Sequence, residues 1–167
     1  MPDSPLDRFD AEPAERALEL LRACNAAPSF ATQVAAGRPY GSADALVARA
    51  EQVSRALPWD EVAAALAAHP RIGDRVEGAS AEATASRREQ SGMGAADAEL
   101  RAQVLAGNRA YEERFDHVFL IRAAGRSAEE MLTELHRRLA NSPEAERAEV
   151  TEQLAQITAL RVRGLVT

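Results

Sequence analysis

The chain contains no lysine, and all 20 of its basic residues are arginine. Mechanisms that need a lysine Schiff base, including those of ordinary pyridoxal-phosphate enzymes, are therefore excluded. A Walker-type phosphate loop, which requires Gly-Lys-Ser/Thr, is excluded as well. Cys24 is the only cysteine, so an intrachain disulfide and a cysteine metal cluster are ruled out. The three histidines, His69, His117 and His136, are not spaced as zinc ligands, and we expect no metal site.

Excess positive charge and long apolar runs are missing too. The formal net charge of -6 argues against a nucleic-acid partner, and no apolar run approaches the roughly 20 residues that span a membrane. Residues 1–10 are polar and acidic, unlike a secretory signal, and residues 165–167 are not a peroxisomal address. We expect one domain over residues 1–167, located in the cytoplasm.

Apolar residues recur with helical periodicity along most of the chain. After Ser42, a favourable N-cap, Leu46, Ala50, Val53 and Leu57 lie on one helix face. Comparable patterns predict helices at 13–24, 29–36, 80–91, 96–115 and 127–139, from 58 to near 69, and from 143 onward. Residues 118–121 form a short apolar run of undefined type, and no segment alternates like a strand. The sequence predicts an all-α fold, a single compact domain of about seven to eight helices.

An arginine interrupts the apolar stripe of the last predicted helix. Val150, Leu154 and Ile157 form the stripe, and Arg161 occupies its next position. An arginine on a core face requires an anion or several acceptors, because burying it alone is costly. Its stem could also reach the helix edge, or it could form an internal salt bridge, and the pattern alone favours that interpretation.

A histidine and one helix face could also carry chemistry. His69 lies at a predicted helix C-terminus before Pro70 and could hold a proton near neutral pH, although the position alone favours a histidine that caps the helix by binding its terminal carbonyls. Ser86, Glu89 and Gln90 share one face of the next helix and together offer a hydroxyl, a carboxylate and an amide. Such a face suits a small polar ring, although most faces of this kind are simply solvated.

These segments resemble, in order and spacing, the signatures of one enzyme family. Residues 69–74 (His-Pro-Arg-Ile-Gly-Asp) resemble the His-Pro-x-Ile/Leu-Gly signature of the 2-oxo-4-hydroxy-4-carboxy-5-ureidoimidazoline (OHCU) decarboxylases. Ser86-x-x-Glu89-Gln90 resembles the second signature of that family. Further likeness covers almost the whole chain, at residues 38–40, 108–115, 118–121, 137–144 and 157–161.

The resemblance implies an all-α enzyme without metal or organic cofactor that forms (S)-allantoin in urate breakdown. It implies His69 as the catalytic acid/base, with Glu89 and Arg161 as essential partners, and a homodimer. The implied substrate contacts are Pro70, Ser86, Gln90, Phe119, Leu120, Ile121, Arg122 and Ala123. The lack of lysine agrees with this, because the C=N bond of the substrate can itself accept the electron pair released with CO2.

Departures from the family pattern keep other functions open. Asp116 stands where many relatives have glycine, Arg122 where a small or apolar residue is common, and Phe30 near a frequent tryptophan. One alternative is a hydrolase or isomerase acting on another ureido or hydantoin ring. Another is a non-catalytic helical interaction module, in which His69, Glu89 and Arg161 would not meet.

Overall fold

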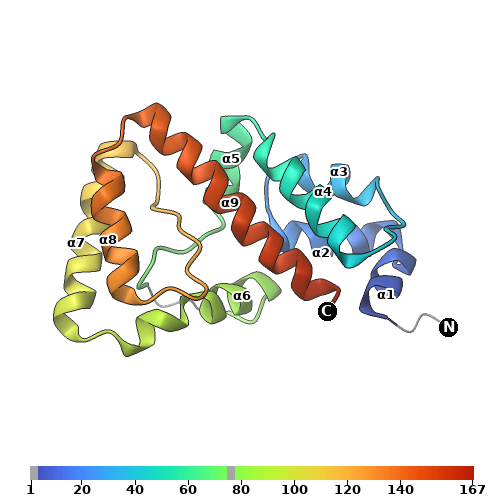
Figure 1. Ribbon diagram of the computed structural model, residues 1–167, viewed down its shortest axis with the longest axis horizontal. Coiled ribbons are helices and arrows are strands. Elements are labelled where there is room, and N and C mark those ends of the chain that lie inside the picture. Colours follow the sequence, from blue (N-terminus) through green and yellow to red (C-terminus); the bar gives the residue numbers. More distant parts are fainter. Residues whose placement is uncertain (1–3, 75–77) are drawn as a thin grey trace. The chain divides into compact units, whose positions relative to one another are not determined.

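A computed structural model describes residues 4–74 and 78–167. These residues form nine α-helices and one 3-10 helix, η1 (Gln90–Ala95), without a strand (Figure 1). None of the described helices is both long enough and apolar enough to span a membrane. The all-α prediction is confirmed, with the α-helices α1 (Pro5–Ala11), α2 (Ala14–Cys24), α3 (Phe30–Ala35), α4 (Ala43–Arg55), α5 (Trp59–Leu66), α6 (Ala81–Glu89), α7 (Ala98–Phe115), α8 (Ala128–Leu139) and α9 (Pro143–Leu165).

Helix α1 is an α-helix that the sequence did not predict. Ser4 Oγ accepts a hydrogen bond from the Asp7 N–H at 3.1 Å, and the Asp7 carboxylate accepts from the Ser4 N–H at 3.2 Å. This reciprocal capping box, with Pro5 in the first turn, begins the helix. Phe9 is the only buried residue of the seven, so periodicity had too few apolar positions to reveal the helix.

Tertiary contacts divide the chain into two compact units. One unit comprises Met1–Ala65 and Leu154–Thr167, and the other comprises Leu66–Gln153. Helix α9 therefore contributes its first half to the second unit and its second half to the first. That the chain forms a single domain over residues 1–167 stays a prediction.

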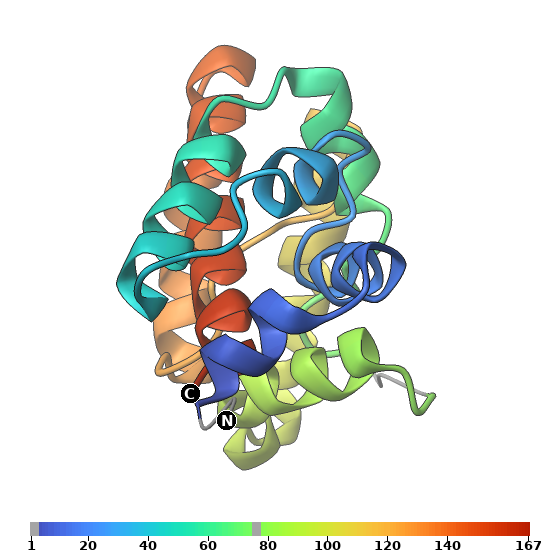
Figure 2. The same ribbon diagram turned by 90° about the vertical axis from the view of Figure 1, so that its right-hand side faces the viewer.

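In the first unit, α3 packs against both α2 and α4 (Figure 2). A buried polar joint lies at the C-terminal end of α2, where the Asn25 amide donates to Thr158 Oγ1 at 3.1 Å and to Ser54 Oγ at 3.3 Å. The Asn25 side-chain oxygen accepts from the Ala27 N–H at 2.9 Å. Because buried polar groups require partners, this joint fixes the second half of α9 against α2 and α4.

Residues 38–40 have a structural role in the same unit. The Arg38 guanidinium donates to the carbonyls of Phe9 at 2.8 Å and Glu12 at 2.9 Å, which satisfies acceptors that α1 leaves open at its C-terminus. The Tyr40 N–H donates to an Asp10 carboxylate oxygen at 3.0 Å. This segment therefore ties α1 to the connection between α3 and α4.

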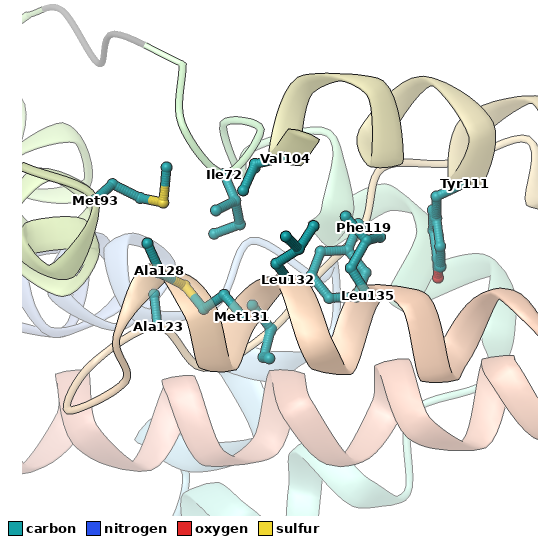
Figure 3. Close-up of a cluster of buried hydrophobic side chains, with 11 residues drawn as sticks. Ile72, Met93, Val104, Tyr111, Phe119, Ala123, Ala128, Met131, Leu132 and Leu135 are labelled. Carbon is teal, nitrogen blue, oxygen red and sulfur yellow. The ribbon is translucent and has the colours of Figure 1, made fainter. Parts of the chain in front are cut away.

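The second unit is built on the pair α7 and α8, which lie side by side (Figure 1). Gly107 permits their close approach, because a Cβ atom at this position would overlap the Leu135 side chain. The apolar core joins α7 and α8 to η1 and to two loops, as Figure 3 shows. Its buried members are Ile72, Met93, Val104, Tyr111, Phe119, Ile121, Ala123, Ala128, Met131, Leu132 and Leu135.

Candidate active site

His69 stands just beyond the C-terminal end of α5. Its backbone N–H donates to the Leu66 carbonyl at 3.0 Å, and the residue is half-buried. The bond satisfies one of the last carbonyls of the helix, and Pro70 prevents the helix from continuing. The predicted position at a helix C-terminus is confirmed, and the side chain is partly open to solvent.

The loop after Pro70 connects the first two signature segments directly. The Gln90 side-chain oxygen accepts a hydrogen bond from the Gly73 N–H at 3.2 Å. Gly73 has a φ of 89°, a left-handed conformation that favours glycine. Ile72, which directly precedes Gly73, is buried in the apolar core beside Val104 (Figure 3). The structure thus brings the His69 loop and the segment containing Gln90 together within one unit.

The polar face predicted for residues 86–90 is divided between two elements. Ser86 and Glu89 lie in the last turn of α6, whereas Gln90 begins η1. Ser86 is buried, and Glu89 and Gln90 are half-buried. The helix predicted to end at about Ser91 thus ends at Glu89, and Gln90 is its C-cap, with its N–H donating to the Ser86 carbonyl. Helix η1 lies so close to the next loop that a Cβ atom on Gly92 would overlap the Arg126 carbonyl oxygen.

The segment 119–123 is irregular and runs between α7 and α8. Phe119, Leu120, Ile121 and Ala123 are buried, and Arg122 is half-buried. The Leu120 carbonyl accepts from Arg138 Nη1 at 2.7 Å, and the Arg122 N–H donates to Gln153 Oε1 at 2.8 Å. Side chains of α8 and α9 therefore hold a backbone that no helix or sheet stabilises.

A buried ion pair supports this segment, and the sequence analysis did not identify it. Arg138 Nε contacts Glu146 Oε1 at 2.8 Å, and both side chains are almost fully buried. The Tyr111 hydroxyl donates to the same carboxylate at 2.5 Å. Burial, followed by this hydrogen bond to Glu146, raises the pKa of the Tyr111 hydroxyl, which keeps it protonated as a donor.

A signal for this pair was present in the sequence. Met131, Leu135 and Arg138 follow the helical spacing of a core face, which is the same pattern that singled out Arg161. Glu146 lies in the first turn of α9, where an acidic residue also suits the helix dipole, and it is fully buried. The guanidinium of Arg138 also lies 4.5 Å from the centre of the Phe119 ring, a favourable cation–π distance.

Two departures from the family pattern have visible structural consequences. Asp116 is the C-cap of α7 and has a φ of 62°, a left-handed conformation that glycine adopts without strain. Arg122 uses its backbone carbonyl to accept from Arg126 Nε at 2.8 Å. Its own Nε is buried without a hydrogen-bond partner among the described residues.

Arg161 occupies the expected position on α9. Val150, Leu154 and Ile157 are buried along the stripe, and Arg161 continues it with 9% of its surface exposed. Its predicted place on the core face is confirmed. Arg161 belongs to the unit formed by Met1–Ala65 and Leu154–Thr167, whereas His69, Ser86, Glu89, Gln90 and residues 119–123 belong to the other. The meeting of Arg161 with His69 and Glu89 stays a prediction.

Within residues 4–74 and 78–167, no three His, Cys, Asp or Glu side chains lie together in a group that could hold a metal ion. The part of the candidate site within Leu66–Gln153 offers an imidazole, a hydroxyl, a carboxylate and an amide. Such groups bind a small polar molecule through hydrogen bonds, and the imidazole can also exchange a proton with it.

Comparison with known proteins identifies the family. Residues 10–163 match the sequence model of the OHCU decarboxylases. A 2-oxo-4-hydroxy-4-carboxy-5-ureidoimidazoline decarboxylase from Amia calva is 30% identical over 141 residues, which represent 83% of this chain and 81% of the relative.

Two solved structures share the fold. A crystal structure of OHCU decarboxylase in the presence of (S)-allantoin has a TM-score of 0.75 at 22% identity, over 92% of this chain and 98% of the other. A crystal structure of (S)-allantoin synthase has a TM-score of 0.72 at 14% identity, over 96% of this chain and 54% of the synthase. From the sequence match over residues 10–163 and the identity to the Amia calva relative, the chain belongs to the OHCU decarboxylase family.

Proposed function

We propose that this chain decarboxylates 2-oxo-4-hydroxy-4-carboxy-5-ureidoimidazoline to (S)-allantoin in urate breakdown. The observation that carries the proposal is the family match, which extends over residues 10–163 and so includes every candidate site residue. The structure adds support, because the hydrogen bond from Gly73 to Gln90 joins the His69 loop to the Ser86–Gln90 segment. Two sequence motifs thereby become parts of one local arrangement.

The contacts of the candidate residues suggest how they divide the work of binding. The Gln90 oxygen already accepts from Gly73, so its amide NH2 is the group we assign to a carbonyl of the substrate. Ser86 and Glu89, one helical turn apart on α6, are assigned to the ring and ureido N–H groups. Pro70 and residues 119–123 supply apolar surface and backbone groups, since an irregular segment offers N–H and C=O groups outside any helix ladder.

His69 and Arg161 are assigned to the chemical step. The carbon–carboxylate bond breaks, CO2 leaves, and the electron pair moves towards the adjacent C=N bond of the substrate. His69 exchanges a proton with the hydroxyl or carboxylate region, and Arg161 donates two parallel hydrogen bonds to the ring carbonyl or to developing negative charge. Protonation of carbon on a single face then produces the (S) centre. No lysine or bound cofactor is needed in this scheme.

The experiment supplies freshly generated urate-oxidation intermediate and follows CO2 release together with the circular dichroism of the allantoin formed. His69→Asn should lower kcat by about 10²–10⁴, the usual contribution of one general acid/base. His136→Asn, which changes an exposed histidine of α8, is the matched control and should leave kcat unchanged. A His69→Asn enzyme with wild-type turnover would contradict the acid/base role.

Arg161→Lys tests the guanidinium. An ammonium group cannot reproduce the planar fork, so we expect this variant to be inactive although the charge is retained. Arg163→Lys, an exposed arginine paired with Asp44 at 2.9 Å, is the control on the same helix. Full activity of Arg161→Lys would make Arg161 a structural ion-pair residue instead.

The same assay separates the alternative functions. A hydrolase or isomerase acting on a related ring would change the substrate without releasing CO2, and an interaction module would change neither signal. Our proposal also includes a cytoplasmic, cofactor-independent homodimer, which the family resemblance implies. Sedimentation of the purified chain measures the oligomeric state directly.

A further inference from the structure

The backbone that follows His69 is anchored to one face of α7. Asn108 Nδ2 donates to the Ile72 carbonyl at 2.8 Å, and this bond is buried. One turn further along the helix, Glu112 binds Arg71 through two parallel hydrogen bonds of 2.5 and 3.1 Å. Asn108 and Glu112 are separated by four residues and therefore lie on the same face of α7. Two consecutive loop residues are thus held by one rigid helix.

The anchors leave the His69 backbone little freedom. Upstream, the His69 N–H is bound to the Leu66 carbonyl at 3.0 Å. Pro70 has a fixed φ, and Arg71 and Ile72 are both held by α7. The main chain on either side of His69 is therefore fixed by contacts within a single unit, Leu66–Gln153.

We propose that Asn108 and Glu112 are positioning residues that fix the His69 imidazole through the Arg71–Ile72 backbone. This inference rests on the proposed catalytic role of His69. Misplacement of a catalytic group by about 1 Å can cost on the order of 10²-fold in rate, so rigid support of the loop has a large effect on turnover.

The chemistry of Asn108 favours positioning over simple packing. Its side chain is 2% exposed, yet Oδ1 has no hydrogen-bond partner within the described part of the chain. An aliphatic side chain would fill the same place without leaving a buried oxygen unsatisfied. The Nδ2 donor satisfies the Ile72 carbonyl through a buried bond, which an aliphatic side chain could not do. Arg71, at the x position of the His-Pro-x-Ile/Leu-Gly signature, adds a second anchor through its pair with Glu112.

The kinetic test compares kcat and KM in single variants. Asn108→Ala should lower kcat about tenfold or more while KM changes less than about threefold, because Ser86, Glu89 and residues 119–123, which carry most of the proposed binding contacts, lie outside the loop. Glu112→Gln should lower kcat about two- to fivefold, in keeping with a partly exposed ion pair. Val34→Ala, a buried change in α3, controls for lost stability, and Glu19→Gln, which removes an exposed pair with Arg16, controls for lost charge.

Charge reversal provides the rescue. Arg71→Glu alone should lower kcat, and combining it with Glu112→Arg should restore kcat to within about twofold of wild type. The imidazole NMR signals of His69 should shift in Asn108→Ala and Glu112→Gln, while those of His136 stay in place. This signal is independent of activity, so it separates the inference from the proposed function. Wild-type turnover of His69→Asn would contradict the catalytic role of His69. Unchanged His69 NMR signals in Asn108→Ala and Glu112→Gln would contradict the positioning role of Asn108 and Glu112.

The inference is overturned if Asn108→Ala and Glu112→Gln fold normally and keep wild-type kcat and His69 signals. It is also overturned if the reversed pair folds but stays as impaired as Arg71→Glu alone. Should Asn108→Ala not fold, the Glu112 and Arg71 variants still decide the matter, because loss of a partly exposed ion pair changes stability little and leaves the fold intact.

Discussion

Replacing Glu146 by Gln tests the buried network that supports residues 119–123. The carboxylate accepts from Arg138 Nε at 2.8 Å, from the Tyr111 hydroxyl at 2.5 Å and from Asn141 Nδ2 at 3.0 Å. Glutamine has nearly the same shape, so the substitution removes the negative charge without creating a cavity. The Arg138 guanidinium then loses its closest counter-charge and keeps the partly exposed Glu149, whose Oε2 lies 3.6 Å from Arg138 Nε.

The magnitude follows from burial. Arg138 and Glu146 have side-chain exposures of 1% and 0%, so water cannot replace the lost carboxylate. Breaking a buried ion pair by removing one partner costs about 3–5 kcal/mol. For a chain of this size, each kcal/mol corresponds to about 2–4 °C in Tm, so we expect Tm to fall by about 6–20 °C.

Thermal and urea unfolding followed by circular dichroism measure the effect. Glu144→Gln is the matched control, because Glu144 lies in the same first turn of α9 but is exposed. We expect it to change stability by no more than about 0.5 kcal/mol. The double variant Arg138→Met/Glu146→Leu should be less destabilised than Glu146→Gln, since it leaves no unpaired buried charge. A loss below about 1 kcal/mol for Glu146→Gln would refute this reasoning.

Three further predictions concern stability. Asp116→Gly should stabilise the protein by about 0.5 kcal/mol in urea unfolding, because glycine adopts the left-handed conformation without strain; destabilisation would contradict this. Gly92→Ala should lower Tm, with a cost of about 1–3 kcal/mol, because the methyl group would overlap the Arg126 carbonyl; an unchanged Tm would show that η1 can move. The hydrogen bond from Arg137 lowers the pKa of Glu149 below its usual 4.5, so its contribution to stability is present above about pH 4.5 and lost as pH falls through the folded-state pKa. Glu149→Gln should therefore destabilise the protein at neutral pH and much less in acid, and an equal loss at both pH values would exclude this linkage.

The starts of helices that are set by capping residues close in the sequence could be predicted. Ser42 caps α4 by accepting from the Ala45 N–H at 3.0 Å, and Ser127 caps α8 by accepting from the Glu130 N–H at 3.1 Å. The Ser42 cap was expected, and the helix predicted from 127 begins at the Ser127 cap, since both signals lie within four residues. The short helix α1 was missed although its capping box is equally local, because a helix of seven residues has little apolar periodicity.

In the candidate site, too, the sequence predicted local features but not contacts between distant residues. The buried register of Arg161 followed from spacing along α9, and the residue types at 69, 86, 89 and 90 followed from the motifs. The spacing could not reveal that Gln90 leaves α6 and binds Gly73, since 17 residues separate the two along the chain. The role of Arg138 beneath residues 119–123 was hidden for the same reason.

The sequence by itself determined the helical class, most helix ends, the family resemblance and the absence of lysine chemistry. These depend on periodicity, on caps within one turn and on composition, which tertiary contacts do not alter. Only the tertiary structure decided that α7 holds the loop after His69 and that a buried arginine and glutamate hold the segment 119–123. Such contacts join residues far apart in the chain, and their energy depends on burial and direction, which exist only once the helices have packed.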